Sequence, residues 1–406
     1  MLHSGFTMIT NQERRIMEKY THIIIGGGST AFAAIQGIRQ HDKQGSIAVL
    51  TDESVALYKR PPLSKGLWKD TPLDKIWLKL EDENITVLVN HLVVDLDPVK
   101  KNVKTADGQE FQYNTLLLAT GAAPRHLPFS DPEIMYYRQY SDYLKLRELT
   151  EKHDRFAVIG AGFIGSEIAA ALAMNQKQVV LIEAGEGIGK AVFPMDIVQY
   201  LNEFYRSKGV QLLVNQPVKE IEKQGNMHHI TLASGQEIVV DGVIAGVGVN
   251  AQSQVAEKAG ITVANGIRVN SYLETSQPDI FAAGDVAAFH SPALDKIVRL
   301  EHIDNAEHMG HVAGENMAGG NIEYDYLPMF YSDLFDIGYE AVGLIDARLD
   351  TQVVWYEPYK KGVIYYSKDN VIKGILLWNV WDKVDIAREI INEQKWVNQT
   401  DLMNLI

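Results

Sequence analysis

Two glycine-rich turns, each placed between a buried strand and a helix, constrain this chain more strongly than any other feature of its sequence. In the clearer copy, the apolar strand 156–159 leads into G-A-G-F-I-G at 160–165. An alanine-rich helical stretch follows, and a second buried strand, 179–182, ends at Glu183. Strand, glycine turn, helix, strand and terminal acid in this order predict a βαβ unit that binds a dinucleotide.

The residues of this unit have distinct physical tasks. Gly160 permits the sharp turn, Gly162 lets a pyrophosphate approach the backbone, and Gly165 lets the helix pack closely on the strand. The helix N-terminus adds free N–H groups and a positive dipole end. Glu183 is expected to bind the ribose 2′-hydroxyl and so to favour NADH over NADPH, with Lys190 on the same loop partly offsetting its charge. A glycine turn that serves packing alone is the alternative.

A weaker copy of the same unit lies near the N-terminus. Strand 21–25 leads into G-G-G-S-T-A at 26–31, and a helix through Arg39 and strand 47–50 follow. The residues expected to hold the first dinucleotide are Gly26, Gly28, Ser29, Ala31 and Asp52. Two dinucleotide sites in one chain imply hydride transfer between a nicotinamide dinucleotide and a flavin dinucleotide, FAD.

Composition narrows the possible partners. The length of 406 residues predicts two or three domains. The formal net charge of −14 argues against nucleic acid or an anionic membrane as a partner, and no apolar stretch has the length of a membrane span. Residues 1–18 lack a signal-peptide core and are expected to form a flexible extension, so we expect a cytoplasmic location, or a mitochondrial one in a eukaryote.

The sequence contains no cysteine. Many flavoproteins with two dinucleotide sites pass their electrons to a redox-active C-x-x-C pair, which this chain cannot form. Its electrons therefore have to reach an acceptor outside the chain.

A stiff cationic loop, Y-K-R-P-P-L-S-K at 58–65, follows the first unit. Its paired prolines fix the backbone close to the first dinucleotide site. Arg60 then suits a pyrophosphate, and Lys65 can reach the reactive end of the cofactor. The alternative is a surface turn with solvated charges, which an isolated motif of this kind would favour.

Three further buried strands, 116–118, 243–245 and one that ends on Gly284, also run into glycine turns. Because open α/β sheets bind ligands at the carboxyl ends of their strands, residues at these turns are expected to extend the two sites. They are Thr120, Gly121, Arg125, Gly284 and Asp285 for FAD, and Gly246 and Gly248 for NAD.

The remaining stretches predict further elements. Residues 77–113 are expected to form a small antiparallel insertion, and 211–240 a meander. Helices are expected at 141–152, 196–207, 303–317 and 384–394. The C-terminal region is rich in strands and aromatic residues, most of which should pack in the core. Phe330 and Tyr331 are the exception, because a flavin ring needs an apolar, planar wall.

Glu301 and His302 directly precede the helix at 303–317. The N-terminal dipole of that helix would favour negative charge at the pyrimidine edge of a reduced flavin. His302, His308 and His311 resemble a metal cluster at first sight. A helix cannot place His302 and His308 on one face, so a metal site is disfavoured.

Taken together, these motifs resemble the flavoprotein family of ferredoxin reductases and apoptosis-inducing factor. The resemblance rests on G-G-G at 26–28, Y-K-R-P-P-L-S-K at 58–65, G-A-G-F-I-G-S-E at 160–167, A-A-G-D at 282–285 and Glu301-His302. Three C-terminal stretches look more like apoptosis-inducing factor than like the bacterial reductases: V-A-G-E-N-M at 312–317, G-Y-E-A-V-G-L at 338–344 and I-L-L-W-N at 375–379.

This resemblance implies an α/β fold with two Rossmann-like dinucleotide-binding domains, for FAD and NADH, and a C-terminal α+β domain. The FAD domain would be discontinuous, at 19–130 and 262–322. The NADH domain would span 131–261, and the C-terminal domain 323–406.

The resemblance also implies roles at the reaction site. Lys65 and Glu167 would pair beside the flavin, and His302 would border the isoalloxazine ring, which makes these three the expected catalytic residues. Phe163, followed by Ile164, would lie in the nicotinamide pocket.

Two residues depart from the family pattern. Tyr331 is the aromatic residue in the position of the F-W-S-D motif, which predicts weaker stacking on the nicotinamide. Asp52 follows the second strand of the FAD unit where close relatives commonly have Glu, and its side chain is shorter.

The expected function is that of an FAD-dependent NADH oxidoreductase. Hydride would pass from NADH to FAD, and electrons would then reach an unidentified acceptor such as a ferredoxin, a rubredoxin or a quinone. The alternative is a redox-sensing protein, in which NADH produces a long-lived charge-transfer complex of reduced FAD and NAD that changes the association state. The protein would then be a monomer or a redox-dependent homodimer.

Overall fold

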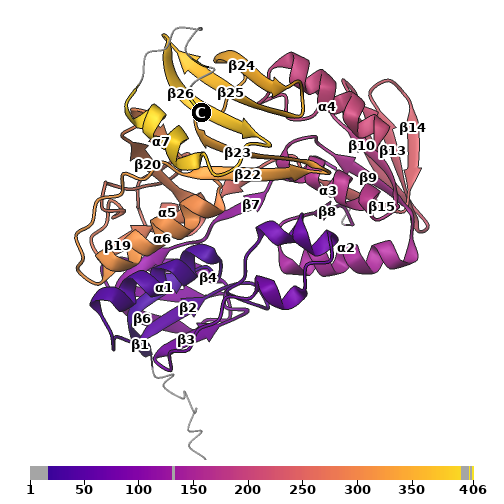
Figure 1. Ribbon diagram of the computed structural model, residues 1–406. Helices are drawn as coiled ribbons and strands as arrows, with labels where there is room; N and C mark the ends of the chain where they lie inside the picture. The colour runs from indigo at the N-terminus through magenta and orange to yellow at the C-terminus, as the bar shows by residue number, and fades with distance from the viewer. Residues whose placement is uncertain (1–16, 130–132, 395–401, 403–404) are drawn as a thin grey trace, which may run out of the picture.

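Two parallel sheets, one behind each glycine turn, and a C-terminal antiparallel sheet form the framework of the molecule (Figure 1). The computed structural model describes residues 17–129, 133–394, 402 and 405–406. Most of the expected N-terminal extension, residues 1–16, lies outside the described residues. Glu18 was wrongly assigned to that extension: it begins the first strand and pairs in parallel with Phe111.

The first sheet contains the first glycine turn. Its strands are β1 (Glu18–Ile25), β2 (Ile47–Leu50), β3 (Ile85–Leu88), β4 (Val93–Asp97), β5 (Asn102–Thr105), β6 (Glu110–Leu118) and β19 (Ile280–Ala282). Strands β3, β2, β1, β6 and β19 are parallel neighbours in that order. The returns of the 116–118 and 280–282 segments to this sheet explain why residues far apart in sequence meet at its carboxyl edge.

The prediction of an antiparallel insertion at 77–113 is only partly right. Strands β4, β5 and β6 form an antiparallel meander as expected. Strand β3, however, pairs in parallel with β2 and belongs to the main sheet. The strand before Asp285 is also shorter than expected: β19 ends at Ala282, and Gly284 opens a short 3-10 helix, η4 (Gly284–Val286).

The second sheet repeats the first. Its parallel order is β11 (Gln211–Leu213), β10 (Gln178–Ile182), β9 (Arg155–Ile159), β15 (Gly242–Ala245) and β8 (Met135–Tyr136). An antiparallel meander of β12 (Val218–Gln224), β13 (Met227–Leu232) and β14 (Glu237–Val240) is attached to it. The sequence prediction placed Gln211 in that meander, but β11 pairs in parallel with β10. The duplicated order confirms the internal repeat.

Seven helices lie beside these sheets in the described residues: α1 (Ser29–His41), α2 (Tyr140–Lys152), α3 (Phe163–Met174), α4 (Met195–Ser207), α5 (Gln254–Lys258), α6 (Ile303–Met317) and α7 (Val384–Asn392). All but the short α5 were expected from the sequence. The predicted ends agree within two residues, except that α3 begins three residues before the predicted start at Ser166. Helices α1 and α6 lie side by side (Figure 1). They approach closely because α6 has glycine at the contact: a Cβ at Gly314 would lie 2.0 Å from the carbonyl oxygen of Ala34.

The C-terminal sheet lies across the top of the view in Figure 1, with helix α7 on it. Its antiparallel order is β22 (Met329–Leu334), β23 (Ile337–Gly343), β26 (Val371–Trp378), β25 (Lys361–Lys368) and β24 (Asp350–Glu357). Tyr339, Tyr366 and Trp378 are fully buried there, which confirms that most of the aromatic residues serve packing.

Short strands join the parts of the molecule. Strands β7 (Ala122–Pro124) and β16 (Val249–Ala251) pair with each other, and β17 (Val263–Ala264), β18 (Gly266–Arg268), β20 (Ala287–Ser291) and β21 (Lys296–Val298) form a small sheet. In the described part of the chain, we find no helix with both the length and the apolar character of a membrane span.

Candidate functional site

The first glycine turn has a shape that leaves its middle open. Gly26 has a φ of +116°, and a Cβ on it would lie 2.1 Å from the carbonyl oxygen of Ala119. Gly28 is the N-cap of α1, no side chain caps this helix, and a Cβ on Gly28 would meet no atom within 4 Å. Ser29 opens the helix and Ala31 is buried beneath it. A phosphate group can therefore reach the backbone at Gly28 and the helix dipole behind it.

The second glycine turn has the same construction. Gly160 has a φ of +93° and packs on the carbonyl of Gly246, where a Cβ would lie 2.6 Å away. A Cβ on Gly165 would lie 1.9 Å from the carbonyl oxygen of Gly160, so only glycine allows α3 this close to its strand. Gly162 is the N-cap of α3 and has open space around it. The first glycine turns the chain, the second stays accessible, and the third allows close packing, as the sequence analysis expected.

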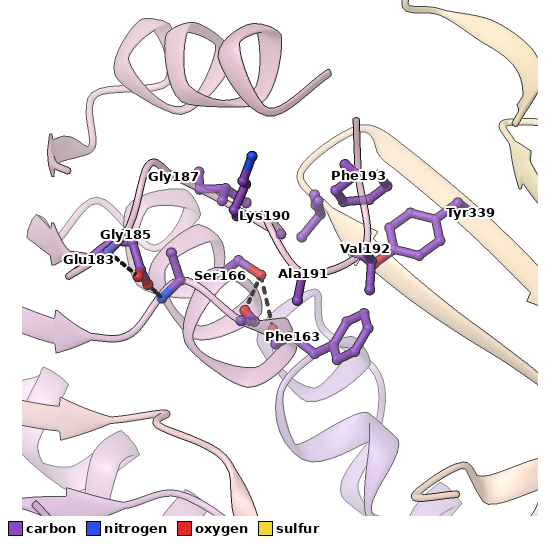
Figure 2. Close-up of a pocket in the computed structure, with 15 residues that line it drawn as sticks. Phe163, Ser166, Glu183, Gly185, Gly187, Lys190, Ala191, Val192, Phe193 and Tyr339 are labelled. Atoms are coloured by element: carbon purple, nitrogen blue, oxygen red, sulfur yellow. Dashed lines mark hydrogen bonds between the residues drawn. The ribbon is translucent and has the colours of Figure 1, made fainter. Parts of the chain in front are cut away.

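A pocket of about 370 Å³ opens directly over this second turn (Figure 2). Glu183 and Gly185 lie at one end of it, and Phe193 and Tyr339 lie at the other. Phe163 projects from the first turn of α3 beneath the pocket and is exposed. Ile164, the next residue, is half-buried.

The carboxylate of Glu183 links the glycine turn to the loop after β10. Its Oε2 accepts a hydrogen bond from the backbone N–H of Ala161 at 2.6 Å, and its Oε1 accepts one from the N–H of Gly185 at 2.7 Å (Figure 2). The carboxylate therefore lies at the carboxyl end of β10, where a ribose is expected to bind. Lys190 lines the same pocket but pairs with Glu186 at 3.0 Å, so its charge is already matched.

The loop that forms the upper wall of the pocket is anchored from two sides. Asn202 on α4 accepts from the N–H of Ile188 and donates to the carbonyl of Glu186. The C-terminal region fixes the other end, because the hydroxyl of Tyr366 donates to the carbonyl of Val192 at 2.8 Å. The pocket is therefore shaped jointly by the second glycine unit and the C-terminal sheet.

A buried ion pair lies where these units meet. Lys65 Nζ donates to Glu167 Oε2 at 2.8 Å, with side-chain exposures of 12% and 2%. Lys65 comes from the proline loop of the first unit, directly before the 3-10 helix η2 (Gly66–Trp68), and Glu167 from the first turns of α3. The structure thus brings together two residues that the sequence separates by 102 positions.

An aromatic wall stands beside this ion pair. The ammonium of Lys65 lies 5.3 Å from the ring centre of Tyr331, and the ring of Phe330 meets those of Phe163, at 5.4 Å, and His302, at 4.6 Å. Residues from both glycine units and the C-terminal sheet therefore line one surface, as a site that holds a flavin and a nicotinamide requires.

His302 is the N-cap of α6, and its Nδ1 is buried without a hydrogen-bond partner among the described residues. Burial lowers the pKa of His302 to about 4, against the opposing charges of Asp285 and Asp304. The ring is therefore neutral near pH 7. An enclosed, unpaired nitrogen is costly on its own and suits a bound group that offers it a partner.

Two charged residues predicted for the first site, Arg60 and Asp285, each form an ion pair with a residue that was not predicted. Arg60 donates to Glu53 at 2.5 Å and to the hydroxyl of Tyr58, while Asp52 is exposed at the end of β2. Asp285 accepts from Arg138 at 2.5 Å.

Four more residues predicted for the FAD site are engaged with other parts of the chain. The hydroxyl of Thr120 donates to the carbonyl of Gln252, and Gly121 lies in the left-handed region at a φ of +66°. Arg125 is exposed and donates to the carbonyl of Val249 beside Gly248, at the β7–β16 junction. Glu301 is exposed and pairs with Arg299 at 2.7 Å.

Four contacts were missed at the sequence level. Glu53 pairs with the predicted cation Arg60, and Arg138 pairs with the predicted anion Asp285. The hydroxyls of Ser64 and Ser332 both donate to Glu167. Ser64 lies inside the Y-K-R-P-P-L-S-K motif and could have been noted. Ser332 likewise lies inside the F-Y-S-D stretch at 330–333, in the position of the F-W-S-D motif, and could have been noted. Arg138 carries no local signal, because it acts on Asp285 across 147 positions.

Within the residues that the structure describes, no three histidine, aspartate or glutamate side chains come together in a way that could hold a metal ion. His308 stacks on Tyr326 at 3.8 Å, and His311 lies against Gln40 on α1. These histidines therefore serve packing between elements.

Comparison with known proteins gives a consistent picture. Residues 20–310 match the family model described as pyridine nucleotide-disulphide oxidoreductase, and residues 313–358 and 356–393 match that of the C-terminal domain of mitochondrion-associated apoptosis-inducing factor. Apoptosis-inducing factor 1 of Dictyostelium discoideum is 31% identical over 94% of this chain and 80% of its own length. Rubredoxin-NAD(+) reductase of Pseudomonas putida is 31% identical over 92% of this chain and 96% of its own.

Among solved structures, a ferredoxin reductase from Rhodopseudomonas palustris aligns with a TM-score of 0.87 at 29% identity, over 94% of this chain and 96% of that one. The similarity thus covers both glycine units and the C-terminal sheet together.

Proposed function

The chain belongs to the pyridine nucleotide-disulphide oxidoreductase family, and on that premise we propose that it is an FAD-dependent enzyme that oxidises NADH and delivers electrons to a small redox protein. The observation that carries this proposal is the buried Lys65–Glu167 pair. It joins the loop of one glycine unit to the helix of the other, beside an aromatic wall that both units share with the C-terminal sheet.

Each glycine unit is assigned one dinucleotide. FAD belongs to the turn at 26–31, with Arg60, Asp285 and His302 toward it, and NADH to the pocket over the turn at 160–165. We retain the domain division 19–130 with 262–322 for FAD, 131–261 for NADH and 323–406 for the C-terminal domain. The sheets support it, because each parallel sheet falls within one of the first two units.

FAD, when bound, supplies the two-electron acceptor that no amino-acid side chain provides. The protein's own residues do the positioning and set the charge. Lys65 holds an ammonium in a site with little access to water, where a fixed positive charge stabilises negative charge that develops nearby. Glu167 fixes that ammonium in place, and Phe163 offers an exposed ring beside the pocket for the nicotinamide.

His302 contributes a neutral ring to the same surface. Because its pKa lies at about 4, it donates or accepts a hydrogen bond without adding a charge near pH 7. Positive charge on this surface therefore comes from Lys65 and from the N-terminus of α6, which His302 caps.

The electron acceptor lies outside the chain. The sequence has no cysteine, so no internal disulfide can be reduced, unlike in the proteins that give the family its name. The rubredoxin reductase and ferredoxin reductase relatives support a small iron–sulfur or iron–thiolate protein as the acceptor.

A second candidate function is a redox-sensing protein in which NADH produces a long-lived reduced state and a change of association state. The match of residues 313–393 to the C-terminal model of apoptosis-inducing factor favours it. Both functions share the same cofactor sites and differ in how fast the reduced protein returns its electrons.

One experiment separates them. The protein is reduced with NADH without oxygen and then mixed with air, a rubredoxin or a [2Fe–2S] ferredoxin, while the flavin absorbance and the elution volume are followed. Rapid, repeated reoxidation by one of the iron proteins supports the enzyme. A persistent long-wavelength band, with a shift in elution volume and no acceleration by either iron protein, supports the sensor and contradicts the enzyme.

A further inference from the structure

The carboxylate of Glu167 joins three segments of the chain that lie far apart in sequence. Ser64 Oγ and Lys65 Nζ both donate to Oε2, at 2.6 and 2.8 Å, and Ser332 Oγ donates to Oε1 at 2.5 Å. Ser64 and Lys65 lie in the proline loop, Glu167 on α3, and Ser332 on β22 of the C-terminal sheet. Glu167 and Ser332 are almost completely buried.

The two carboxylate oxygens are therefore not equivalent. Oε2 has two donors from the loop, whereas Ser332 is the donor that the structure gives Oε1. The terminal torsion of a glutamate side chain is broad and roughly two-fold, so hydrogen bonds rather than rotamer preference decide its orientation. Without the Ser332 hydroxyl, the carboxylate loses the contact that sets its plane.

We propose that Ser332 is a positioning residue for the reaction site: its hydroxyl fixes the plane of the Glu167 carboxylate, so that Oε2 holds the Lys65 ammonium at the ring of Tyr331. This inference rests on the proposed function, because it assigns the ammonium a place beside the reacting groups. It also gives the C-terminal sheet a part in the reaction, since Ser332 donates from that sheet to the ion pair.

The register of the C-terminal sheet strengthens this assignment. Ser332 lies opposite Tyr339 on β23, and Tyr339 lines the pocket over the second glycine turn. Ser332 therefore lies beside a residue of the pocket wall while its hydroxyl donates to Glu167.

The cation that faces Glu167 is Lys65. Three phenols also face it, those of Tyr205, Tyr331 and Tyr339. Burial raises the pKa of all three phenols, that of Tyr331 to about 12, so they stay neutral at ordinary pH. Lys65 is therefore the charged group that the orientation of the Glu167 carboxylate holds in place.

The test compares Ser332→Ala, Ser332→Thr and the control Ser291→Ala, which removes an equally buried serine hydroxyl on β20. The rate at which NADH reduces the flavin is measured by stopped flow. We expect Ser332→Ala to slow reduction by about tenfold or more. Ser332→Thr, which keeps the hydroxyl, should restore the rate, and Ser291→Ala should match the wild type.

A second measurement does not depend on NADH. The unfolding temperature of the FAD-free protein is compared for Ser332→Ala alone and in a Glu167→Gln background. Because a neutral amide is a weaker acceptor than a carboxylate, the decrease caused by Ser332→Ala should be smaller in that background.

The outcomes separate this inference from the proposed function. A wild-type protein that NADH does not reduce refutes the function, and the unfolding comparison still decides whether Ser332 and Glu167 are coupled. An unchanged rate in Ser332→Ala overturns the inference, and so does an equal loss of rate in the Ala and Thr variants. Equal decreases in unfolding temperature in both backgrounds also overturn it.

Discussion

Replacing Lys65 with alanine is the sharpest perturbation of the site. Its ammonium lies 2.8 Å from Glu167 and 5.3 Å from the ring centre of Tyr331, and only 12% of its side chain is exposed. The substitution removes the charge and leaves the glycine turns untouched. It therefore tests whether this ion pair belongs to the chemistry or only to the fold.

The two readings of the pair differ in magnitude. An exposed ion pair contributes about 0 to 1 kcal/mol and would leave the reaction unaffected. Loss of a preorganised charge beside a reacting group costs about 2.7 to 4 kcal/mol, which corresponds to a rate lower by about 10² to 10³. The burial of both partners favours the second reading, so we expect Lys65→Ala to slow flavin reduction by about 10²-fold or more.

The assay is anaerobic stopped-flow reduction of the bound flavin by NADH at saturating concentration. Lys69→Ala is the matched control, because Lys69 lies four residues further along the same loop and pairs loosely with Asp333 at 4.0 Å with its side chain 38% exposed. Breaking a buried pair also destabilises a protein by about 3 to 5 kcal/mol, so FAD content and unfolding temperature must be recorded for both variants.

Wild-type reduction rates in Lys65→Ala, with FAD bound, would refute the reasoning. The same conclusion would follow if Lys69→Ala slowed reduction equally, since the effect would then come from the loop as a whole. Glu167→Ala should act in the same direction as Lys65→Ala.

Three further results are expected. Glu183→Ala should reduce the preference for NADH over NADPH by about one to two decades, measured as the ratio of kcat/KM values, and an unchanged ratio would show that another residue sets it. Gly162→Ala should raise KM for NADH but leave the unfolding temperature unchanged, because the new Cβ meets no atom within 4 Å. Gly165→Ala should lower the unfolding temperature, because its Cβ would lie 1.9 Å from a carbonyl oxygen. Equal effects of the two variants on the unfolding temperature would contradict the assigned geometry. The pKa of His302 in the folded protein, about 4, lies below its ordinary value of 6.5. The stability tied to the neutral ring is therefore present above about pH 6.5 and is lost as the pH falls toward 4. In FAD-free protein, His302→Phe should make the unfolding temperature less sensitive to acid between these pH values, and parallel curves for the variant and the wild type would show that His302 does not titrate as described.

The glycine turns could be predicted from sequence because their constraint is local. A positive φ at Gly26 and Gly160, and the close approach at Gly165, depend on residues that follow one another along the chain. The helices beside them could be predicted for the same reason, since their apolar spacing and end residues lie within one segment.

Strand pairing could not be predicted with the same accuracy. Ile85–Leu88 and Gln211–Leu213 are short strands next to antiparallel meanders, and nothing in their own residues tells whether their neighbours run parallel or antiparallel. The direction is decided by pairing with β2 and β10, which lie earlier in the chain and beyond an intervening segment.

The residues of the candidate site also differ in whether the sequence could identify them. Motif residues such as Lys65 and Glu167 could be named from sequence through a family resemblance, although they lie 102 positions apart. Arg138 could not, because an ordinary arginine becomes a site residue only through a contact made across 147 positions. Ser332 lies inside a family motif, but its partner Glu167 is 165 positions away, and only the fold shows that the two meet.

The central claim is that this chain binds FAD and that NADH reduces it. Anaerobic titration of the purified protein with NADH, followed by its visible absorbance, tests this most directly. We expect a yellow protein whose FAD is released on denaturation and whose absorbance is bleached by a stoichiometric amount of NADH. A colourless protein that cannot be reconstituted with FAD, or bound FAD that NADH leaves oxidised, would contradict it.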